Sequence, residues 1–217
     1  MTEGPSYDVT REFLYGAACH EAGHAAALFT AADYFGLTGR DVLTGLRIDK
    51  DGNGFIVDFH GNRVEECRGL FTMSRTWIGE LTLVSGATIE VKKHYAKILE
   101  AHALILLAGP YASAINERGL PDFCLDVDMD TARSDLHKVD QISRAISDLD
   151  LPFSSFYRRS WLQLRMDAHD LVHQNWTAIE AIAARLYEKG ELSGQEAYDI
   201  FASTYAAEAA AHAALPA

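Results

Sequence analysis

The chain has 217 residues, of which 48% are hydrophobic and 23% are charged, and it carries a net charge of −12. This composition excludes a disordered chain and indicates a globular protein long enough to bury a core of its own. The acidic balance, with no run of Lys and Arg to offset it, argues against nucleic acid and anionic membranes as partners.

Cysteine usage and the apolar segments indicate an intracellular setting. The three cysteines, Cys19, Cys67 and Cys124, are odd in number and far apart, so we expect no disulfide framework and a reducing cytosol. The first residues, MTEGPSYDVTREF, lack the basic and apolar regions of a signal peptide. The most apolar run, 103–115, is too short to span a bilayer and contains a proline, which favours a buried helix. We therefore expect a cytoplasmic protein without a membrane partner.

In the first part of the chain, the pattern predicts a helix followed by a β-hairpin. Apolar and small residues recur at helical spacing up to about Ala32. Two strand-like stretches follow at 42–48 and 54–60, and the turn-rich DKDGN between them indicates that they pair as a hairpin. Residues 61–86 show no clear periodicity.

The rest of the chain is predicted to be helical. Helices are expected at about 88–116 and 131–149, and the last third continues in the same way. Within it, Ser193 and Glu196 have the spacing of a capping box for the final helix. The alanine-rich end, 207–217, is expected to fray.

Residues 17–29, AACHEAGHAAALF, contain the motif H-E-x-x-H at His20, Glu21 and His24. On a helix, positions i and i+4 lie one turn apart on the same face, so the two histidines can bind one metal ion together. Glu21 lies about 100° further round the helix, within reach of a water molecule at the metal. Metal-assisted hydrolysis needs this arrangement, because the metal acidifies the water and the carboxylate takes up its proton.

The alternative is a solvent-exposed helix face that carries two histidines by chance. The residues around the motif, GAAC before it and AAALF after it, are small and apolar, as in a buried helix. Burying two imidazoles and a carboxylate there costs free energy unless a partner such as a metal ion compensates. The surroundings therefore favour a metal site.

A catalytic zinc site uses three protein ligands and one water molecule, so a third ligand is required. The residue six positions after His24 is Thr30 rather than a third histidine. Glu65 and Glu90 are candidates, and the acidic stretch 126–138 offers several aspartates. The residues alone leave this choice open.

The chain also resembles a known family, the FtsH-type AAA+ zinc metalloproteases, over most of its length. The sequence CHEAGHAAA is similar to the H-E-A-G-H-A core of that family. Four further stretches follow in the family order: its hairpin, its L-x-A-G-R-A-A-E helix, its A-S-N-D-L-x-x-A-T segment and its closing helices. They are VLTGLRIDKDGNGFIVDF, LILLAGPYASAI, ARSDLHKVDQISRAI and LVHQNWTAIEAIAARLYEKGELSGQEAYDIF.

The resemblance implies a role for each residue that matches the family motifs. His20 and His24 become zinc ligands, Glu21 the catalytic base and Asp135 the third ligand. It also implies an extended substrate held by strand addition at the edge of the hairpin.

The chain departs from the family in three respects. Pro110 stands where the family has arginine, and 66–86 has the character of an insertion, within a possible inserted range of 61–86. No phosphate-binding G-x-x-x-x-G-K-[ST] motif occurs, so we expect ATP-independent activity on peptides or unfolded proteins. A separate ATPase partner and homo-oligomer formation stay open.

Two other motifs resemble metal sites, but a structural role, as a turn or as a packing helix, explains each of them better. Residues 49–60 imitate an EF-hand loop, but position 12 is His60 instead of glutamate, and a hairpin turn fits better. Residues 169–173, HDLVH, repeat the histidine pair beside apolar residues, which favours a packing helix.

Several residues near Asp135 are weaker candidates for the site. We interpret DVDMD, 126–130, as a solvated acidic loop, with Asp130 and His137 as alternatives to Asp135. Cys19 and Cys124 are expected to be small core residues rather than ligands.

We therefore expect one domain over residues 1–217, mainly α (α+β), with a zincin-like helical body and a small β-hairpin sheet. The expected function is zinc-dependent hydrolysis of peptide bonds. The alternative from another class is a non-catalytic zinc-binding or interaction domain that retains a peptidase-like site. Such a domain needs the metal ligands but has no use for Glu21.

Overall fold

The computed structural model describes the backbone of residues 9–48, 55–57, 63–66, 69–73, 87–118, 133–151 and 160–213. Its helices are α1 Val9–Tyr34, α2 Gly39–Val42, α4 Ile89–Arg118, α5 Arg133–Asp148, α6 Trp161–Gln174, α7 Trp176–Lys189 and α8 Gly194–Ala213. Its strands are β1 Leu43–Ile48, β2 Phe55–Val57, β3 Arg63–Glu66, β4 Gly69–Met73 and β5 Glu191–Ser193. The expected fold class, mainly helical with a small antiparallel sheet, is confirmed.

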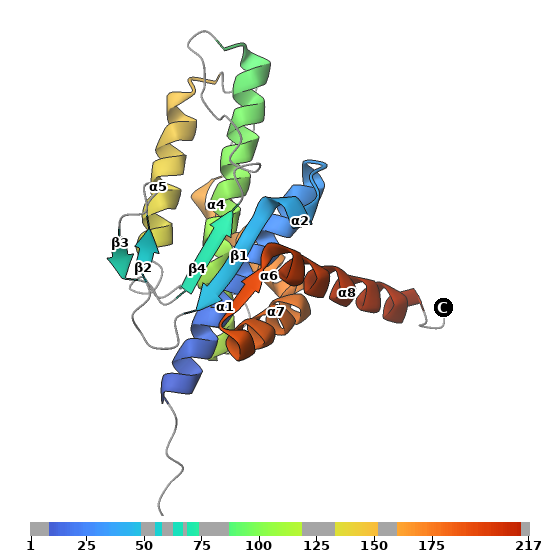
Figure 1. The fold of residues 1–217 in the computed structure, drawn as a ribbon. Coiled ribbons are helices and arrows are strands. Elements are labelled where there is room, and N and C mark those ends of the chain that lie inside the picture. Colours follow the sequence, from blue (N-terminus) through green and yellow to red (C-terminus); the bar gives the residue numbers. More distant parts are fainter. Residues whose placement is uncertain are drawn as a thin grey trace, which may run out of the picture.

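The two longest helices, α1 and α4, pack against each other through small residues at the centre of the fold (Figure 1). A Cβ atom on Gly23 of α1 would lie 2.6 Å from the carbonyl oxygen of Ala108 and 2.7 Å from the Cβ of Ala112 on α4. Only glycine permits this approach. The close crossing brings the motif helix directly onto α4.

The other helices surround this pair. α5 and α6 both pack on α4, and α7 packs on α1 (Figure 1). The buried core contains large side chains from α1, α4 and α7, among them Leu28, Leu107 and Ile182. The core therefore fixes the relative positions of α1, α4 and α5, the three helices that build the candidate site.

The main sheet has the strand order β4-β1-β5, and a separate pair joins β2 to β3. β1 is the central strand, antiparallel to both neighbours: Leu46 pairs with Phe71 of β4 and with Leu192 of β5. Leu46 is buried, and the sheet contacts α1.

The predicted hairpin between 42–48 and 54–60 is wrong in its pairing, although both stretches contain a strand. β1 pairs with β4 and β5 instead, and β2 pairs with β3. Both edges of β1 are occupied by β4 and β5, so no edge of this strand remains for β2. The range 61–86, expected as an insertion, contributes β4 to the main sheet.

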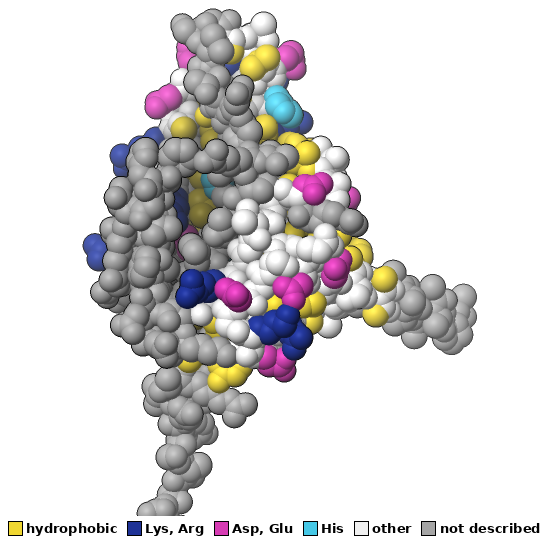
Figure 2. All heavy atoms as spheres, in the orientation of Figure 1, with side chains coloured by type: hydrophobic (Ala, Val, Ile, Leu, Met, Phe, Trp, Pro, Cys, Tyr) yellow, Lys and Arg dark blue, Asp and Glu magenta, His cyan; other side chains and the backbone are white. Residues whose placement is uncertain are grey.

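Helix α8 begins at the predicted capping box. The backbone N–H of Glu196 donates to Ser193 Oγ at 3.2 Å, and the backbone N–H of Ser193 donates to Glu196 Oε2 at 3.0 Å. The helix then extends away from the body (Figure 1) as far as Ala213, into the range expected to fray. Acidic and basic side chains of the described residues lie interspersed over the face drawn in Figure 2.

Helix α4 is long and apolar enough to cross a membrane by length and composition. In this fold, however, 67% of its apolar window is buried inside the protein. It packs against α1, α5 and α6 as a core helix does. The expectation that 103–115 forms a buried helix is confirmed for the residues at its centre, Ile105–Ala112.

Candidate metal centre

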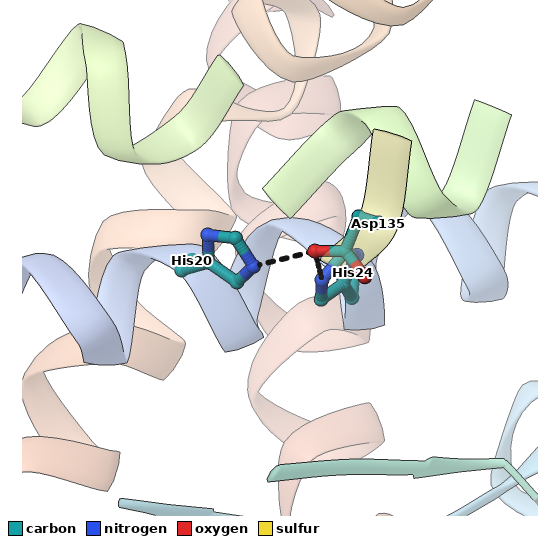
Figure 3. A group of neighbouring side chains, drawn as sticks. All are labelled: His20, His24 and Asp135. Carbon is teal, nitrogen blue, oxygen red and sulfur yellow. Dashed lines mark hydrogen bonds and ion pairs between the residues drawn. The ribbon is translucent and has the colours of Figure 1, made fainter. Parts of the chain in front are cut away.

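Three side chains from two helices converge at one point beside α4 (Figure 3). His20 and His24 project from the same face of α1, and Asp135 lies in the first turn of α5. One ligand atom from each residue lies within 4.8 Å of the other two. The sequence placed the two histidines together by helical spacing, and the fold adds Asp135 to them.

Asp135 contacts both imidazoles through one carboxylate oxygen. Its Oδ2 lies 3.0 Å from Nε2 of His20 and 3.5 Å from Nε2 of His24. Ligands of a tetrahedral zinc ion at about 2.0–2.2 Å from the metal are separated by about 3.3 Å. The two observed distances lie on either side of that value, and all three donor atoms lie within 4.8 Å of one another, so the group is compatible with a bound metal ion.

The other nitrogen of each imidazole is held by a residue of α4. Nδ1 of His24 donates to the backbone oxygen of Ile105 at 2.7 Å, and Nδ1 of His20 lies 3.2 Å from the hydroxyl oxygen of Ser113. Because a carbonyl oxygen only accepts, Nδ1 of His24 carries a proton, and its Nε2 can serve as a ligand. This outer hydrogen bonding is typical of histidines that bind metals.

Gly109 of α4 provides the space that the two imidazoles occupy. A Cβ atom at this position would lie 2.4 Å from Nε2 of His24 and 2.9 Å from Cδ2 of His20. Any larger residue would push the rings out of place. No motif in the sequence marks Gly109, Ile105 or Ser113 as part of the site. Their role depends on how α4 is rotated against α1, which no local motif encodes.

The charges of the cluster stabilise one another in the metal-free protein. Burial alone would raise the pKa of Asp135, but His24 and His20 outweigh it and lower that pKa well below its usual range. Burial would likewise lower the pKa of His24, but Asp135 and then Glu21 raise it above its ordinary value. The carboxylate and the imidazoles of this cluster are therefore electrostatically complementary.

Glu21 is buried on α1 beside the cluster, with 7% of its surface exposed. Burial raises the pKa of its carboxyl, and Asp135 adds to the effect, while His20, His24 and Lys138 oppose it. A carboxylate with a raised pKa takes up a proton more readily than an ordinary one, which suits a general base. Among the described residues, Glu21 does not belong to the group of metal-ligand geometry.

Two further residues lie close enough to influence the charges of the centre. Lys138 of α5 places its Nζ 3.5 Å from Oδ1 of Asp135 and is 48% exposed. Burial, then Lys138 and His24, lower the pKa of His102 to about 4. At neutral pH, His102 is therefore uncharged, and Lys138 is a fixed positive charge at the edge of the centre.

The other candidates for the third ligand lie elsewhere or outside the described residues. Glu90 is exposed in the first turn of α4 and pairs with Lys93 at 2.8 Å. His137 is exposed on α5, within 3.0 Å of Gln141. The side chains of Glu65 and Asp130 lie outside the described residues, as do Cys124 and most of the EF-hand-like stretch.

His169 of the second histidine pair and Cys19 are both buried among packed side chains. His169 is buried on α6 against the ring of Tyr111, whose hydroxyl accepts from Nε of Arg165 at 3.1 Å. Among the described residues, metal-ligand geometry occurs at the cluster around Asp135 and not at this pair. Burial, with a smaller effect of Glu180, raises the pKa of Cys19 to about 12 and leaves it an unreactive core thiol.

No known family model matches the chain, and no curated protein sequence matches it either.

Proposed function

We propose that this protein is a zinc-dependent metallopeptidase with an FtsH-like peptidase domain. The observation that carries the proposal is the approach of Asp135 Oδ2 to Nε2 of both motif histidines, at 3.0 and 3.5 Å. Two imidazole nitrogens and one carboxylate oxygen are donor atoms of the kind that hold a catalytic zinc ion with three protein ligands. The resemblance of the sequence to the family, which rests on the motifs alone, points to the same three residues.

In this proposal, His20, His24 and Asp135 hold the ion, and Ile105 and Ser113 fix the orientation of the imidazoles. When bound, zinc lowers the pKa of water and polarises a carbonyl group. Two imidazoles and one carboxylate leave a fourth position of a tetrahedral ion open, as a catalytic site requires.

Glu21 is the general base of the proposed reaction. It accepts a proton from the attacking water and passes it to the amine that leaves when the peptide bond breaks. Its burial supports this role, because the raised pKa brings its proton affinity nearer to that of the groups with which it exchanges protons. A purely structural metal site has no need of this carboxylate.

The proposed substrate is an extended chain that pairs with an edge strand of the main sheet. In that sheet β1 is paired on both sides, whereas β4 and β5 each have β1 as their one partner among the described residues. An edge strand can hydrogen-bond to an added peptide. We therefore expect peptides and unfolded proteins as substrates, in the cytoplasm and without ATP. A separate ATPase partner or self-association would change the supply of substrate rather than the chemistry.

The test is hydrolysis of casein, an unfolded protein, by the purified chain with one equivalent of zinc. The proposal requires cleavage that stops when a chelator removes the metal and returns when zinc is restored. If the chain binds one zinc per molecule and leaves both casein and short peptides intact, it is a non-catalytic zinc-binding domain, and the proposal is wrong.

A further inference from the structure

Lys138 stands at the boundary between the candidate metal centre and solvent. It follows Asp135 by one helical turn, so the two side chains share a face of α5. Its Nζ lies 3.5 Å from Oδ1 of Asp135, whereas Oδ2 of the same carboxylate faces the imidazoles. With 48% of its side chain exposed, the ammonium group contacts both the cluster and the solvent.

The charge of the centre changes when a divalent ion binds. The carboxylates of Asp135 and Glu21 can offset at most the two positive charges of the ion. Together with the ammonium group of Lys138, 3.5 Å from Oδ1 of Asp135, this group of side chains and ion has a net positive charge, although the whole chain carries −12. Asp135 shares its charge with the metal in that state, so it attracts Lys138 less than before.

We propose that Lys138 is a specificity residue that selects substrates with a carboxylate close to the bond that is cut. This inference rests on the proposed function. A half-exposed ammonium group can form a charge-assisted hydrogen bond with a substrate carboxylate while the neighbouring peptide bond reaches the metal. The A-S-N-D-L-x-x-A-T pattern leaves the position of Lys138 unspecified, so the resemblance to the family gives this residue no role.

The carboxylate can come from two sources. It is either the C-terminal carboxylate of a peptide, in which case the enzyme cuts near chain ends, or the side chain of Asp or Glu next to the cleaved bond. The ammonium group recognises the same chemistry in both.

A different role for Lys138 has different consequences. If it served only to orient Asp135, its removal would weaken zinc binding and affect all substrates equally. A selectivity residue changes the ratio between anionic and neutral ligands instead. The ratio of the affinities for anionic and neutral ligands therefore distinguishes the two roles.

The experiment uses peptidyl hydroxamates, which anchor on zinc and need no turnover. Two matched pairs are compared on the zinc-loaded full chain: a free C-terminal carboxylate against its amide, and a Glu side chain against Gln. The variants are Lys138→Gln, Lys138→Arg and, as a control, Arg144→Gln. Arg144 lies on the same helix, is 76% exposed and pairs with Asp140 at 2.6 Å, so its removal costs the same charge away from the metal.

The wild type is expected to bind the anionic member of one pair about tenfold more tightly. Lys138→Gln should remove this preference, and Lys138→Arg and Arg144→Gln should keep it. The pair that shows the preference identifies the source of the carboxylate.

Equal binding of both members by the wild type, or an unchanged preference in Lys138→Gln, would overturn the inference. A preference that depends on Lys138 in a protein that leaves casein uncut would support the inference and refute the peptidase reaction. Failure to hold zinc would refute both.

Discussion

Asp135 Oδ2 lies 3.0 Å from Nε2 of His20, although 115 positions separate the two residues. The contact joins α5 to α1 across the side of α4. The centre therefore exists only when all three helices are packed. Because a ligand that binds only the folded state stabilises it, zinc should raise the free energy of unfolding of the whole domain.

Substitution of Glu21 separates catalysis from metal binding. Glu21→Gln keeps the shape of the side chain and removes its basicity, so activity on casein should fall by at least about 10²–10⁴-fold while zinc content stays near one per chain. His20→Ala should lose both zinc and activity. Zinc is measured by elemental analysis of the purified variants. Retained activity in Glu21→Gln would show that another group is the base.

Asp135→Ala tests the third ligand. It should weaken zinc binding by more than about a hundredfold, because it removes a ligand and leaves two imidazoles without their carboxylate. Asp140→Ala, on the exposed side of the same helix, is the matched control and should bind zinc like the wild type. Asp128→Ala and Asp130→Ala should also be near normal. Equal losses from Asp128, Asp130 and Asp135 would place the ligand elsewhere.

Gly109→Ala tests the packing of α4 on the imidazoles. The added Cβ would lie 2.4 Å from Nε2 of His24, a buried ring fixed by its hydrogen bond to Ile105. We expect a loss of about 1–3 kcal/mol of stability and weaker zinc binding. Gly16→Ala is the control: its Cβ meets nothing closer than 3.8 Å, so it should stabilise the helix by about 0.5–1 kcal/mol. Denaturant unfolding of both variants compares them, and wild-type zinc affinity in Gly109→Ala would contradict the role assigned to Gly109.

The pH dependence of stability should differ between the metal-free and zinc-bound proteins. The pKa of Asp135 is lowered, so its contribution to stability is present above its unfolded value of 3.8 and lost as the pH falls through the lowered pKa. The pKa of His24 is raised, so its contribution is complete below 6.5 and lost as the pH rises through the raised pKa. The pKa of the buried Glu21 is also raised, so its effect on stability likewise becomes less favourable as the pH rises.

The metal-free protein should therefore lose stability as the pH rises above 6.5. Zinc competes with protons for the imidazoles, so the stabilisation by zinc should grow over the same interval. Melting temperatures in chelator and in zinc, measured across neutral pH, give this difference. A difference in melting temperature between zinc and chelator that stays constant or narrows with rising pH would show that the histidines are not the ligands.

A peptidase without a phosphate-binding motif should depend on the spontaneous opening of its substrates. A folded substrate that is stable by several kcal/mol offers only a minute unfolded fraction. The purified chain should therefore cut a destabilised variant of a test protein much faster than its stable parent, and ATP should change neither rate. Rapid degradation of the stable parent, or a response to ATP, would contradict this expectation.

The helices and the motif residues could be predicted because their signals are local. Spacing on one helix placed His20 beside His24, and the capping box at Ser193 fixed the start of α8. The strand pairs could not be predicted in the same way. The turn-like DKDGN favoured pairing of neighbouring strands, whereas β1 pairs with β4 and β5, which both lie much later in the chain. Such long-range pairing depends on how the whole chain folds, so no local pattern reveals it.

The outer part of the centre also depends on long-range packing. Ser113, Ile105 and Gly109 reach the histidines only through the rotation of α4 against α1. Lys138 shares a face with Asp135 through i,i+3 spacing, which is readable once Asp135 is identified as a ligand.

A zinc ion bound between α1 and α5 can be located by anomalous X-ray scattering at the zinc absorption edge. Crystals of the zinc-loaded protein should give one strong anomalous peak per chain, in contact with Nε2 of His20, Nε2 of His24 and a carboxylate oxygen of Asp135. A peak at the 169–173 histidine pair instead, or no peak at His20 and His24 in a protein that retains zinc, would show that these residues are not the zinc ligands.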